Sequence, residues 1–392
     1  MTALTDYVLP TTDEEVWRYS RIGELDIAEF KPVDDQPVAA PTPDPIEAAL
    51  ATVPVRGVTV VTVNGRMVHL DVAAPGVDVV TDSDDALGIA MAEPTDVFAR
   101  MNNEFTVAPI VVRIARGATV EAPIVIARYV DADGIATFPR TIVIAEEDSR
   151  ARIVEYIASP DSISALTVPV TEIAVGRAAR VDYLSAQNLG LGTWQIGSQV
   201  ATVENDATFT SVAAAFGGDY ARLRTDCRLV GRGATGRLRA VYFGEGEQMH
   251  DFRTFQDHAA PDTTSNLLFK GAVGGRSRSV YTGLIRVRKD ARGTNAFQTN
   301  RNIKLSEHAW AESVPNLEIE NNDVKCSHAS AVGPIDEDQR FYLESRGVPT
   351  PIAERLVVTG FFDEVLARLP VPAAGVALRN LVGGKLDRQV AS

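Results

Sequence analysis

The chain has few cysteines and few histidines. It contains two Cys, Cys227 and Cys326, and five His among 392 residues. Two cysteines cannot form the framework of a disulfide-rich fold, and five histidines leave little for an enzyme with several metal ions. Free thiols persist in a reducing compartment, so the sequence predicts a cytoplasmic protein.

Long apolar segments and a basic charge excess are also absent. No run reaches the roughly 18 apolar residues of a membrane-spanning helix, and the first residues show no basic segment followed by an apolar one, so no secretion signal is expected. The chain has 38 Lys and Arg against 52 Asp and Glu, a net charge of −14. This acidic balance argues against binding to nucleic acid or to an anionic membrane. The Walker spacing of glycines before Lys and Ser/Thr is absent as well, so the chain should not hydrolyse nucleotide itself.

Residues 1–106 are predicted to form an N-terminal domain of mixed structure. A capping box at residues 12–15 precedes apolar positions near helical spacing, which predicts a first helix. Residues 31–54 contain six prolines and are predicted to be a linker or an extended strap. Residues 55–75 alternate around Asn64-Gly65 and predict a hairpin. Residues 82–102 are predicted to be helical.

Residues 107–334 consist of short β-branched runs with almost no helical pattern. A small residue recurs after a polar or glycine corner at intervals of 25 to 32 residues, at Ala118, Ser149, Ala178, Ala207, Ala234, Ala259 and Ala291. A period in this range is typical of solenoids and propellers, and no propeller motif is present. The segment is therefore predicted to be the core of a mainly-β fold, a β-solenoid, with an antiparallel sandwich as the alternative.

Residues 335–392 are predicted to form a C-terminal helical domain. Asp336 caps a helix that ends at Gly347, and Thr350-Pro351 starts a second helix with an apolar face. A short helical segment is expected at residues 376–382. These helices could cover the end of the solenoid or bind a partner.

Cys326 and His328 form the strongest candidate for a chemical site. Residues two apart on a strand point to one face, so the thiol and the imidazole project together. Such a pair suits iron, zinc or copper(I), and Glu318, Glu320 and Asp323 lie just upstream. Two ligands cannot complete a four-coordinate site, so a partner or another group would have to supply the rest. A buried Cys beside a solvent-facing His is the alternative.

His250 and His258 are separated by an even number of residues and would share a face of one strand. A polar cluster in a sheet is the favoured interpretation of this pair, over a metal site. His250 lies next to Asp251, but no nucleophile in a recognisable turn accompanies them.

One stretch of about a hundred residues carries a series of residues in a fixed order and spacing. The series consists of Gln248, His250, Asp251, Thr254, His258, Pro261, Ser265, Lys270, Gly271, residues 283–287, Thr294, Gln298, Asn302, residues 305–306, Ala309, residues 315–319, residues 323–328, Gly333, Asp336 and residues 341–347. In this order and spacing the chain resembles the SufB/SufD family of iron–sulfur cluster assembly proteins. Residues 14–19 also resemble the opening helix of the family.

The resemblance implies a right-handed parallel β-helix core with helical terminal domains. It implies a non-catalytic scaffold subunit of the SufBCD complex, which pairs with SufB through the β-helix and with the SufC ATPase through the C-terminal helices. A nascent iron–sulfur cluster would be shared with SufB at their interface, and a reduced flavin is associated with the complex as a whole. The chain alone could form a homodimer.

Site residues follow from the same resemblance. The cluster-related histidine of the family falls on His328, and the neighbouring cysteine falls on Cys326. Docking of SufC falls on the helices from about residue 336 to residue 369, with the candidate residues Phe341, Tyr342, Arg346, Leu356, Phe361 and Phe362.

Within the family, the Cys-Ser-His triplet resembles the SufD branch. Two alternatives stay open. The first is a SufB-like paralogue in the same pathway, which sulfur transfer onto Cys227 or Cys326 would favour. The second is a β-helical carbohydrate-active enzyme, against which the scattered acidic residues argue.

Overall fold

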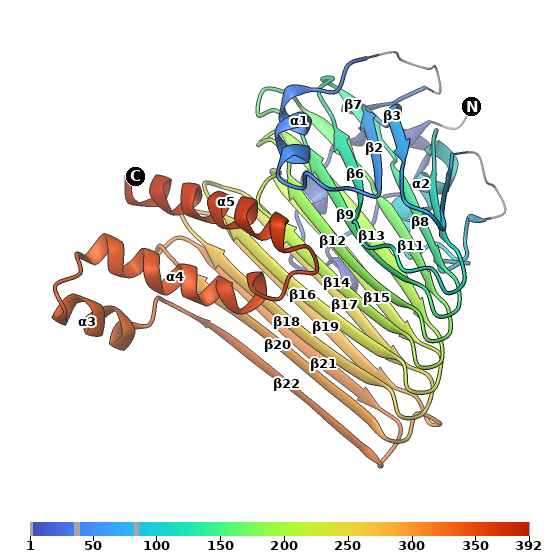
Figure 1. Cartoon of the computed structure of the whole chain (residues 1–392). Coiled ribbons are helices and arrows are strands. Elements are labelled where there is room, and N and C mark those ends of the chain that lie inside the picture. Colours follow the sequence, from blue (N-terminus) through green and yellow to red (C-terminus); the bar gives the residue numbers. More distant parts are fainter. Residues whose placement is uncertain (1–2, 35–39, 82–85, 392) are drawn as a thin grey trace.

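The centre of the chain winds into a β-solenoid of about eight turns in the computed structural model, which describes residues 3–34, 40–81 and 86–391 (Figure 1). Strands make up 44% of the chain and helices 19%. Successive turns place strands alternately in two mainly parallel sheets. The predicted fold, a mainly-β solenoid with small helical regions at its ends, is confirmed.

The first sheet runs from β4 to β21 in the order of the turns. Its main strands are β4 (Val77–Val80), β5 (Ile110–Ile114), β8 (Arg140–Ala145), β11 (Val170–Val175), β13 (Thr193–Val203), β15 (Tyr220–Leu229), β17 (Met249–His258), β19 (Arg278–Val287) and β21 (Trp310–Ile319). Three short strands lie beside this path, namely β1 (Lys31–Pro32), β7 (Ile135–Thr137) and β10 (Ala165–Thr167).

The second sheet begins with an antiparallel hairpin and continues with parallel strands. Its strands are β2 (Val58–Val63), β3 (Arg66–Val72), β6 (Ile124–Tyr129), β9 (Arg150–Ala158), β12 (Arg180–Asn188), β14 (Thr208–Ala215), β16 (Thr235–Gly244), β18 (Thr264–Val273), β20 (Thr294–Lys304) and β22 (Val324–Gly333). The predicted hairpin is confirmed, because β2 and β3 pair across Asn64 and Gly65, whose φ values are 49° and 81°. Since β2 also pairs with β6, the sheets include residues before position 107.

One corner of the solenoid repeats the same backbone conformation. It contains a residue in the left-handed region, with φ between 56° and 73°, at Gly117, Asp148, Ala178, Asp206, Gly233, Asp262 and Gly293. Each corner bonds to the next, as Asp148 N–H does to the Arg177 carbonyl at 2.9 Å. Glycine adopts this conformation at little cost, and Asp tolerates it better than most residues.

A small or hydroxyl residue follows each left-handed residue. The predicted repeat is therefore correct at Ala118, Ser149, Ala207 and Ala234. It is one residue early at Ala178, because Ala179 holds the equivalent position. It is wrong at Ala259 and Ala291, where Thr263 and Thr294 hold the equivalent positions. A threonine is accommodated at each of these corners because its hydroxyl donates to a backbone carbonyl three residues earlier. Thr263 donates to the Ala260 carbonyl at 3.2 Å, and Thr294 donates to the Ala291 carbonyl at 2.8 Å.

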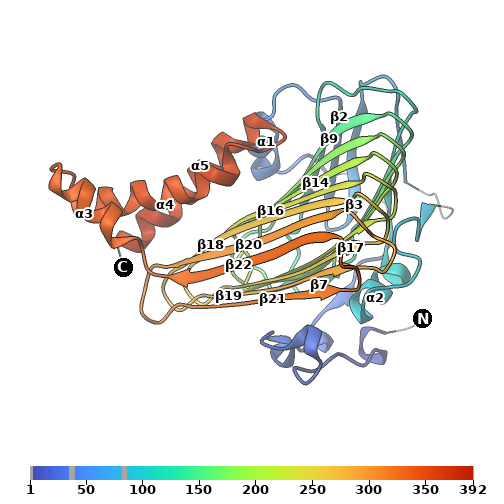
Figure 2. The same cartoon turned by 90° about the horizontal axis from the view of Figure 1, so that it is seen from below.

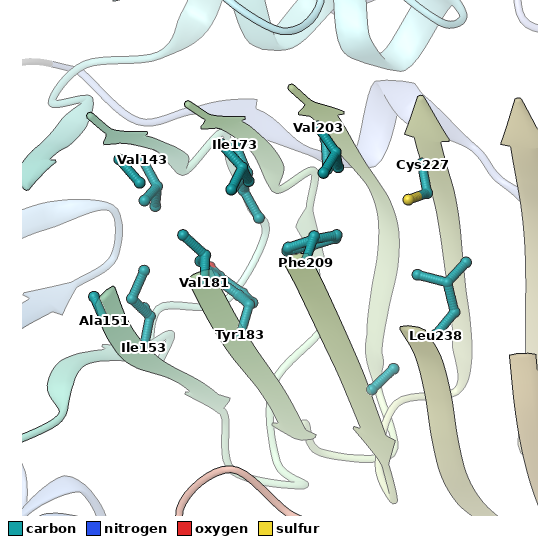
Figure 3. Close-up of a cluster of buried hydrophobic side chains, with 14 of the residues drawn as sticks. Val143, Ala151, Ile153, Ile173, Val181, Tyr183, Val203, Phe209, Cys227 and Leu238 are labelled. Atoms are coloured by element: carbon teal, nitrogen blue, oxygen red, sulfur yellow. The ribbon is translucent and has the colours of Figure 1, made fainter. Parts of the chain in front are cut away.

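The interior of the earlier turns is apolar. Figure 3 shows Ile173, Val203 and Phe209 among the side chains that face each other between the two sheets. Cys227 lies in the same layer and is 1% exposed, and its burial, with nearby acidic groups, raises the pKa of its thiol to about 12. The interior becomes polar in the last turns, where Gln298 is among the buried residues.

Residues 3–30, here called the N-terminal strap, lie against the outer face of the first sheet (Figure 2). They form four 3₁₀ turns at Leu4–Asp6, Glu15–Trp17, Ile22–Glu24 and Ile27–Glu29. Trp17 is 1% exposed and packs under the guanidinium of Arg222, 3.9 Å from its ring centroid. The helix predicted from residues 12–15 is therefore wrong.

Two buried arginines account for the strap conformation. Arg222 donates to the Val16 carbonyl and Arg253 donates to the Arg18 carbonyl, each at 2.7 Å. Both guanidinium groups also bond to the buried carboxylate of Asp251. The carbonyls of Val16 and Arg18 thus accept from side chains of the sheet instead of from the N–H groups of a helix.

Two further sequence predictions are corrected in this region. Residues 44–51 were predicted to belong to a linker, but Asp44–Ala51 forms helix α1, whose buried Ile46 packs on the second sheet. The predicted helix at 82–102 starts only at Val97 in helix α2 (Val97–Phe105). Residues 35–39 and 82–85 lie outside the described residues.

A buried carboxylate explains the late start of α2. Glu172 accepts hydrogen bonds from the backbone N–H groups of Gly88, Ala90 and Met91 at 2.8 to 2.9 Å, and it pairs with Arg140. The backbone before α2 is thereby fixed as a loop on the outer face of the first sheet. This long-range contact cannot be seen in local sequence patterns.

The C-terminal helices follow the predicted order. They are α3 (Glu337–Ser345), α4 (Thr350–Leu366) and α5 (Pro372–Ala391). Asp336 caps α3, and Gly347 follows it with φ at 85°. Helix α5 is longer than the predicted segment 376–382. Helices α4 and α5 pack on the outer face of the second sheet (Figures 1 and 2). In the part of the chain that the structure describes, no helix has the length and apolarity to span a membrane.

Candidate functional site

The solenoid ends in two strands that are each paired on one edge only. Strand β21 pairs with β19, and β22 pairs with β20. Among the described residues, no strand pairs with their other edges, and no residue of either strand is fully buried. We call this surface, formed by β21 and β22, the open end. Because edge strands present unpaired N–H and C=O groups, the open end is suited to pairing with another chain.

Cys326 and His328 lie together on β22, as their spacing predicts. They stand in register with Ala296 and Gln298 of β20, whose side chains are buried inside the solenoid. Cys326 is half-buried, and His328 is exposed. Burial raises the pKa of the Cys326 thiol, although a hydrogen bond with the backbone of Ala296 lowers it in part. Both ligand-type side chains thus project into the mouth of the solenoid at the open end, within reach of a second chain.

Amide side chains form part of the layer below this pair. Gln256 Nε2 donates to Gln298 Oε1 at 3.4 Å, which joins the two sheets across the interior. Gln298 Nε2 and Gln256 Oε1 have no hydrogen-bond partner. Gln298 belongs to the series of residues that resembles the family, but its residue type and spacing predict no role, although it lies one solenoid turn before His328.

The acidic residues upstream are not brought to the Cys–His pair. Glu318 and Glu320 are exposed and lie 3.5 and 3.3 Å from the guanidinium of Arg286. Asp323 is exposed at the corner before β22. Among the residues that the structure describes, no group of three or more His, Cys, Asp or Glu side chains could hold a metal ion. The open end therefore offers a partial ligand set.

His250 and His258 are fully buried in β17, in agreement with the polar-cluster interpretation. His258 bonds through Nδ1 to Thr263 at 2.8 Å and through Nε2 to Ser265 at 2.9 Å. His250 Nε2 lies 3.2 Å from the Gly217 carbonyl. Burial lowers the pKa of each histidine to about 4. Both rings are therefore neutral near pH 7.

A second candidate surface lies on the C-terminal helices. Phe341, Tyr342 and Leu356 are 70%, 59% and 51% exposed. Tyr342 and Leu356 line a groove of about 600 Å³ between α3 and α4, and Arg346 is exposed with its guanidinium 5.4 Å from the Tyr342 ring centroid. We call Phe341, Tyr342, Arg346 and Leu356 the helix surface. This exposed surface combines aromatic and aliphatic side chains with the Arg346 guanidinium.

The remaining two docking candidates pack inward. Phe362 is fully buried and stacks on Phe243 at 6.3 Å between ring centroids, so its assignment as a docking residue is corrected to a core residue. Phe361 is partly buried beneath the ammonium of Lys270, 4.4 Å from its ring centroid. An apolar pattern alone could not separate the face that binds the sheet from the face that is free.

Comparisons with known proteins identify the family to which the chain is similar. A family model described as "SUF system FeS cluster assembly, SufBD core domain" matches residues 128–361. The chain is 38% identical over 224 residues to an iron–sulfur cluster assembly SufBD family protein of Mycobacterium tuberculosis, covering 55% of this chain and 56% of the relative. It is 28% identical over 275 residues to the iron–sulfur cluster assembly protein SufD of Bacillus subtilis, covering 70% and 63%. The matched region thus spans just over half of the mycobacterial relative.

The family match covers more than half of this chain, from β6 to α4. It includes the polar last turns of the solenoid, the Cys326–His328 pair on β22 and the start of the C-terminal helices. The resemblance noted in the sequence is therefore confirmed. The chain belongs to the SufBD family of iron–sulfur cluster assembly proteins.

Proposed function

We propose that the chain is a SufD-like, non-catalytic scaffold subunit on which a nascent iron–sulfur cluster is assembled. The observation that carries the proposal is the position of Cys326 and His328, which project together from an edge strand at the open end. Thiolate and imidazole are common ligands of iron. The cluster is cargo in this proposal, and no residue of the chain is assigned to a flavin.

A second solenoid chain of the SufB type would complete the ligand set. Two side chains leave a cluster-bound iron with unfilled positions, and the described residues supply no third ligand nearby. Pairing at the open end would also satisfy the free edges of β21 and β22. The same partner thus accounts for both the partial ligand set and the unpaired strand edges.

An ATPase of the SufC type would bind the helix surface. The chain itself has no Walker spacing, so ATP hydrolysis would require another subunit. Exposed Phe341 and Tyr342 are of the aromatic type that is enriched at protein interfaces, and Leu356 adds apolar area beside Tyr342. Tyr342 and Arg346 belong to residue types that often dominate binding energy.

The SufB-like alternative receives less support. A sulfur acceptor of that kind needs an accessible thiolate, because the thiolate is the reactive form of cysteine. Cys227 is 1% exposed, and its pKa is raised to about 12. Cys326 remains accessible but lies beside His328, in the triplet that resembles SufD. The family match also favours cluster assembly over carbohydrate chemistry.

The substitution His328→Ala tests the proposal. The chain would be purified with its SufB-type and SufC-type partners, and bound iron and acid-labile sulfide would be measured. We expect the variant complex to assemble but to lose most of its cluster, because the exposed imidazole contributes ligation and not packing. His308→Ala is the matched control, since His308 is exposed in the loop before β21. Full cluster assembly with His328→Ala would contradict the proposed role.

A further inference from the structure

One buried hydrogen-bond donor lies without a partner beneath the open end. Gln298 is 1% exposed, and its Nε2 amide group has no hydrogen-bond partner. Leaving such a group unsatisfied costs about 1–3 kcal/mol, so buried donors normally find an acceptor. Gln298 therefore requires an explanation beyond packing.

Neighbouring polar side chains in the same interior show the contrast. Asn300 donates to Tyr242 Oη at 3.0 Å, Tyr242 donates to Asn302 at 2.7 Å, and Asn302 donates to Asn300 at 2.9 Å. These three residues satisfy each other in a closed ring. Some other buried atoms of these turns also lack a partner, such as Gln256 Oε1 and His250 Nδ1, but among the described residues Gln298 Nε2 is the only buried side-chain amide nitrogen without an acceptor.

The surroundings of Gln298 fix the direction of its free N–H groups. Its Oε1 accepts from Gln256 Nε2 at 3.4 Å, which places Nε2 at the other side of the amide. A Cβ on Gly283 would lie 2.2 Å from Tyr281 Oη and 2.5 Å from Gln298 Nε2, so the ends of these two side chains occupy the space beside this glycine. The Gln298 amide nitrogen therefore lies beside the backbone of β19, on the side of the amide away from Gln256.

The donor lies directly below the candidate ligands. Gln298 is in register with His328, and Ala296 is in register with Cys326. Paired residues on adjacent parallel strands stand about 4.8 Å apart with their side chains on the same face. A group held by Cys326 and His328 at the mouth of the solenoid would therefore rest on the Gln298 amide.

We propose that Gln298 is a binding residue for the cluster, and that its Nε2–H group donates a hydrogen bond to a sulfide of the cluster held at Cys326 and His328. The proposal rests on the proposed scaffold function. Sulfides in such clusters carry negative charge and accept N–H groups, and these hydrogen bonds tune cluster stability and potential. An amide suits this position because it donates without adding a charge to the buried layer.

The test uses the full complex with the SufB-type and SufC-type partners, loaded with ferrous iron and sodium sulfide. Gln298→Leu removes the donor, and Gln298→Glu keeps the shape but replaces the amide by a carboxylate. Gln199→Leu is the matched control, because Gln199 is also a buried interior glutamine but bonds to Ser211 in an earlier turn. Two quantities are measured: the rate of iron loss to a chelator and the shift of the Fe–S Raman bands between H₂O and D₂O.

We expect both Gln298 variants to lose iron about tenfold faster than wild type, because a hydrogen bond to a charged group is worth about that factor. The isotope shift of the Raman bands should shrink in these variants and persist in Gln199→Leu. Unchanged rates and shifts in folded Gln298 variants would overturn the inference and leave the scaffold function standing. A wild-type complex that holds no cluster would instead overturn the scaffold function and this inference with it.

A measurement on wild-type protein covers the case in which the variants do not fold. In the complex, the side-chain amide protons of isotope-labelled Gln298 should exchange with solvent more slowly when the cluster is bound. Equal exchange with and without bound cluster would count against the N–H···S hydrogen bond.

Discussion

His258 shows how a single buried side chain ties the stability of the solenoid to pH. Both ring nitrogens bond to hydroxyl groups, and burial lowers the pKa of the ring to about 4, against the attraction of Asp257. In the unfolded chain, a histidine has a pKa near 6.5. Between about pH 6.5 and pH 4 the unfolded chain therefore binds a proton that the folded chain does not bind, and stability falls as the pH falls.

The substitution His258→Gln should reduce this pH dependence. Glutamine can bond to both hydroxyls but does not titrate, so the loss of unfolding free energy from pH 7 to pH 4.5 should shrink by about 2–3 kcal/mol. Urea unfolding across this range measures the change. His250 titrates in the same way and leaves a residual slope. The exposed His69 provides the control, and a His69→Gln profile that flattens as much as His258→Gln would contradict the assignment.

Strand periodicity explains which site residues the sequence could predict. The alternation of β22 is local, so the common direction of Cys326 and His328 follows from their spacing alone. The role inferred for Gln298 depends on stacking across a full turn, and this register becomes visible only when the corners are aligned. Phe362 was misassigned because residue type does not reveal which face of α4 meets the sheet.

At the scale of elements, α4 is fixed to the solenoid by more than apolar contact. Lys270, on β18, is 4% exposed and donates to the Phe361 carbonyl at 2.9 Å while pairing with Glu364. The buried ammonium thus joins the helix backbone to the sheet. A force applied to the helix surface would reach β18, two second-sheet strands from the edge strand β22.

The two faces of the C-terminal helices should respond differently to substitution. Phe362→Ala removes a fully buried ring and should cost about 3–5 kcal/mol, seen as faster hydrogen exchange in α4 and α5. Phe341→Ser removes an exposed ring and should leave stability within about 0.5 kcal/mol. It should weaken binding of the SufC-type ATPase about tenfold, measured by calorimetry. Unchanged ATPase binding by Phe341→Ser would exclude this residue from the docking contact.

The elements that the sequence predicted correctly are those set by local chemistry. Asn64-Gly65 determines the hairpin turn, and Asp336 determines the start of α3. The helices predicted for the N-terminal strap and for the loop before α2 are wrong, because backbone groups in both segments bond to distant side chains. Arg222 donates to a backbone carbonyl of the strap, and Glu172 accepts from backbone N–H groups of the loop, whereas the local pattern assigns these groups to helices.

For the whole molecule, the two ends of the solenoid differ. At the first turn, the sheets end in antiparallel strands β3 and β4, and β4 has only four residues. Such short or irregular edges discourage pairing with another chain. At the last turn, β21 and β22 have ten residues each and end the sheets without a covering strand in the described chain. Stacked repeats normally need a cap at each end, so the open end is the one where a partner would stack.

A charge placed on the edge strand tests this difference. Ala331→Lys adds an ammonium near the exposed C-terminal end of β22, and lysine on an edge strand opposes strand pairing. We expect association with the SufB-type partner to weaken about tenfold or more, and any homodimer of the chain alone to dissociate, both measured by sedimentation velocity. The free energy of unfolding of the monomer should change by less than about 0.5 kcal/mol, because the Ala331 side chain is exposed.

Val230→Lys is the matched control, since it adds the same charge at a 42% exposed residue in the corner after β15. It should leave association unchanged, which separates an effect on strand pairing from an effect of net charge. If Ala331→Lys associates as tightly as wild type, the second solenoid does not dock on β22. The ligand set at Cys326 and His328 would then have to be completed from another direction, because these side chains share that strand with Ala331.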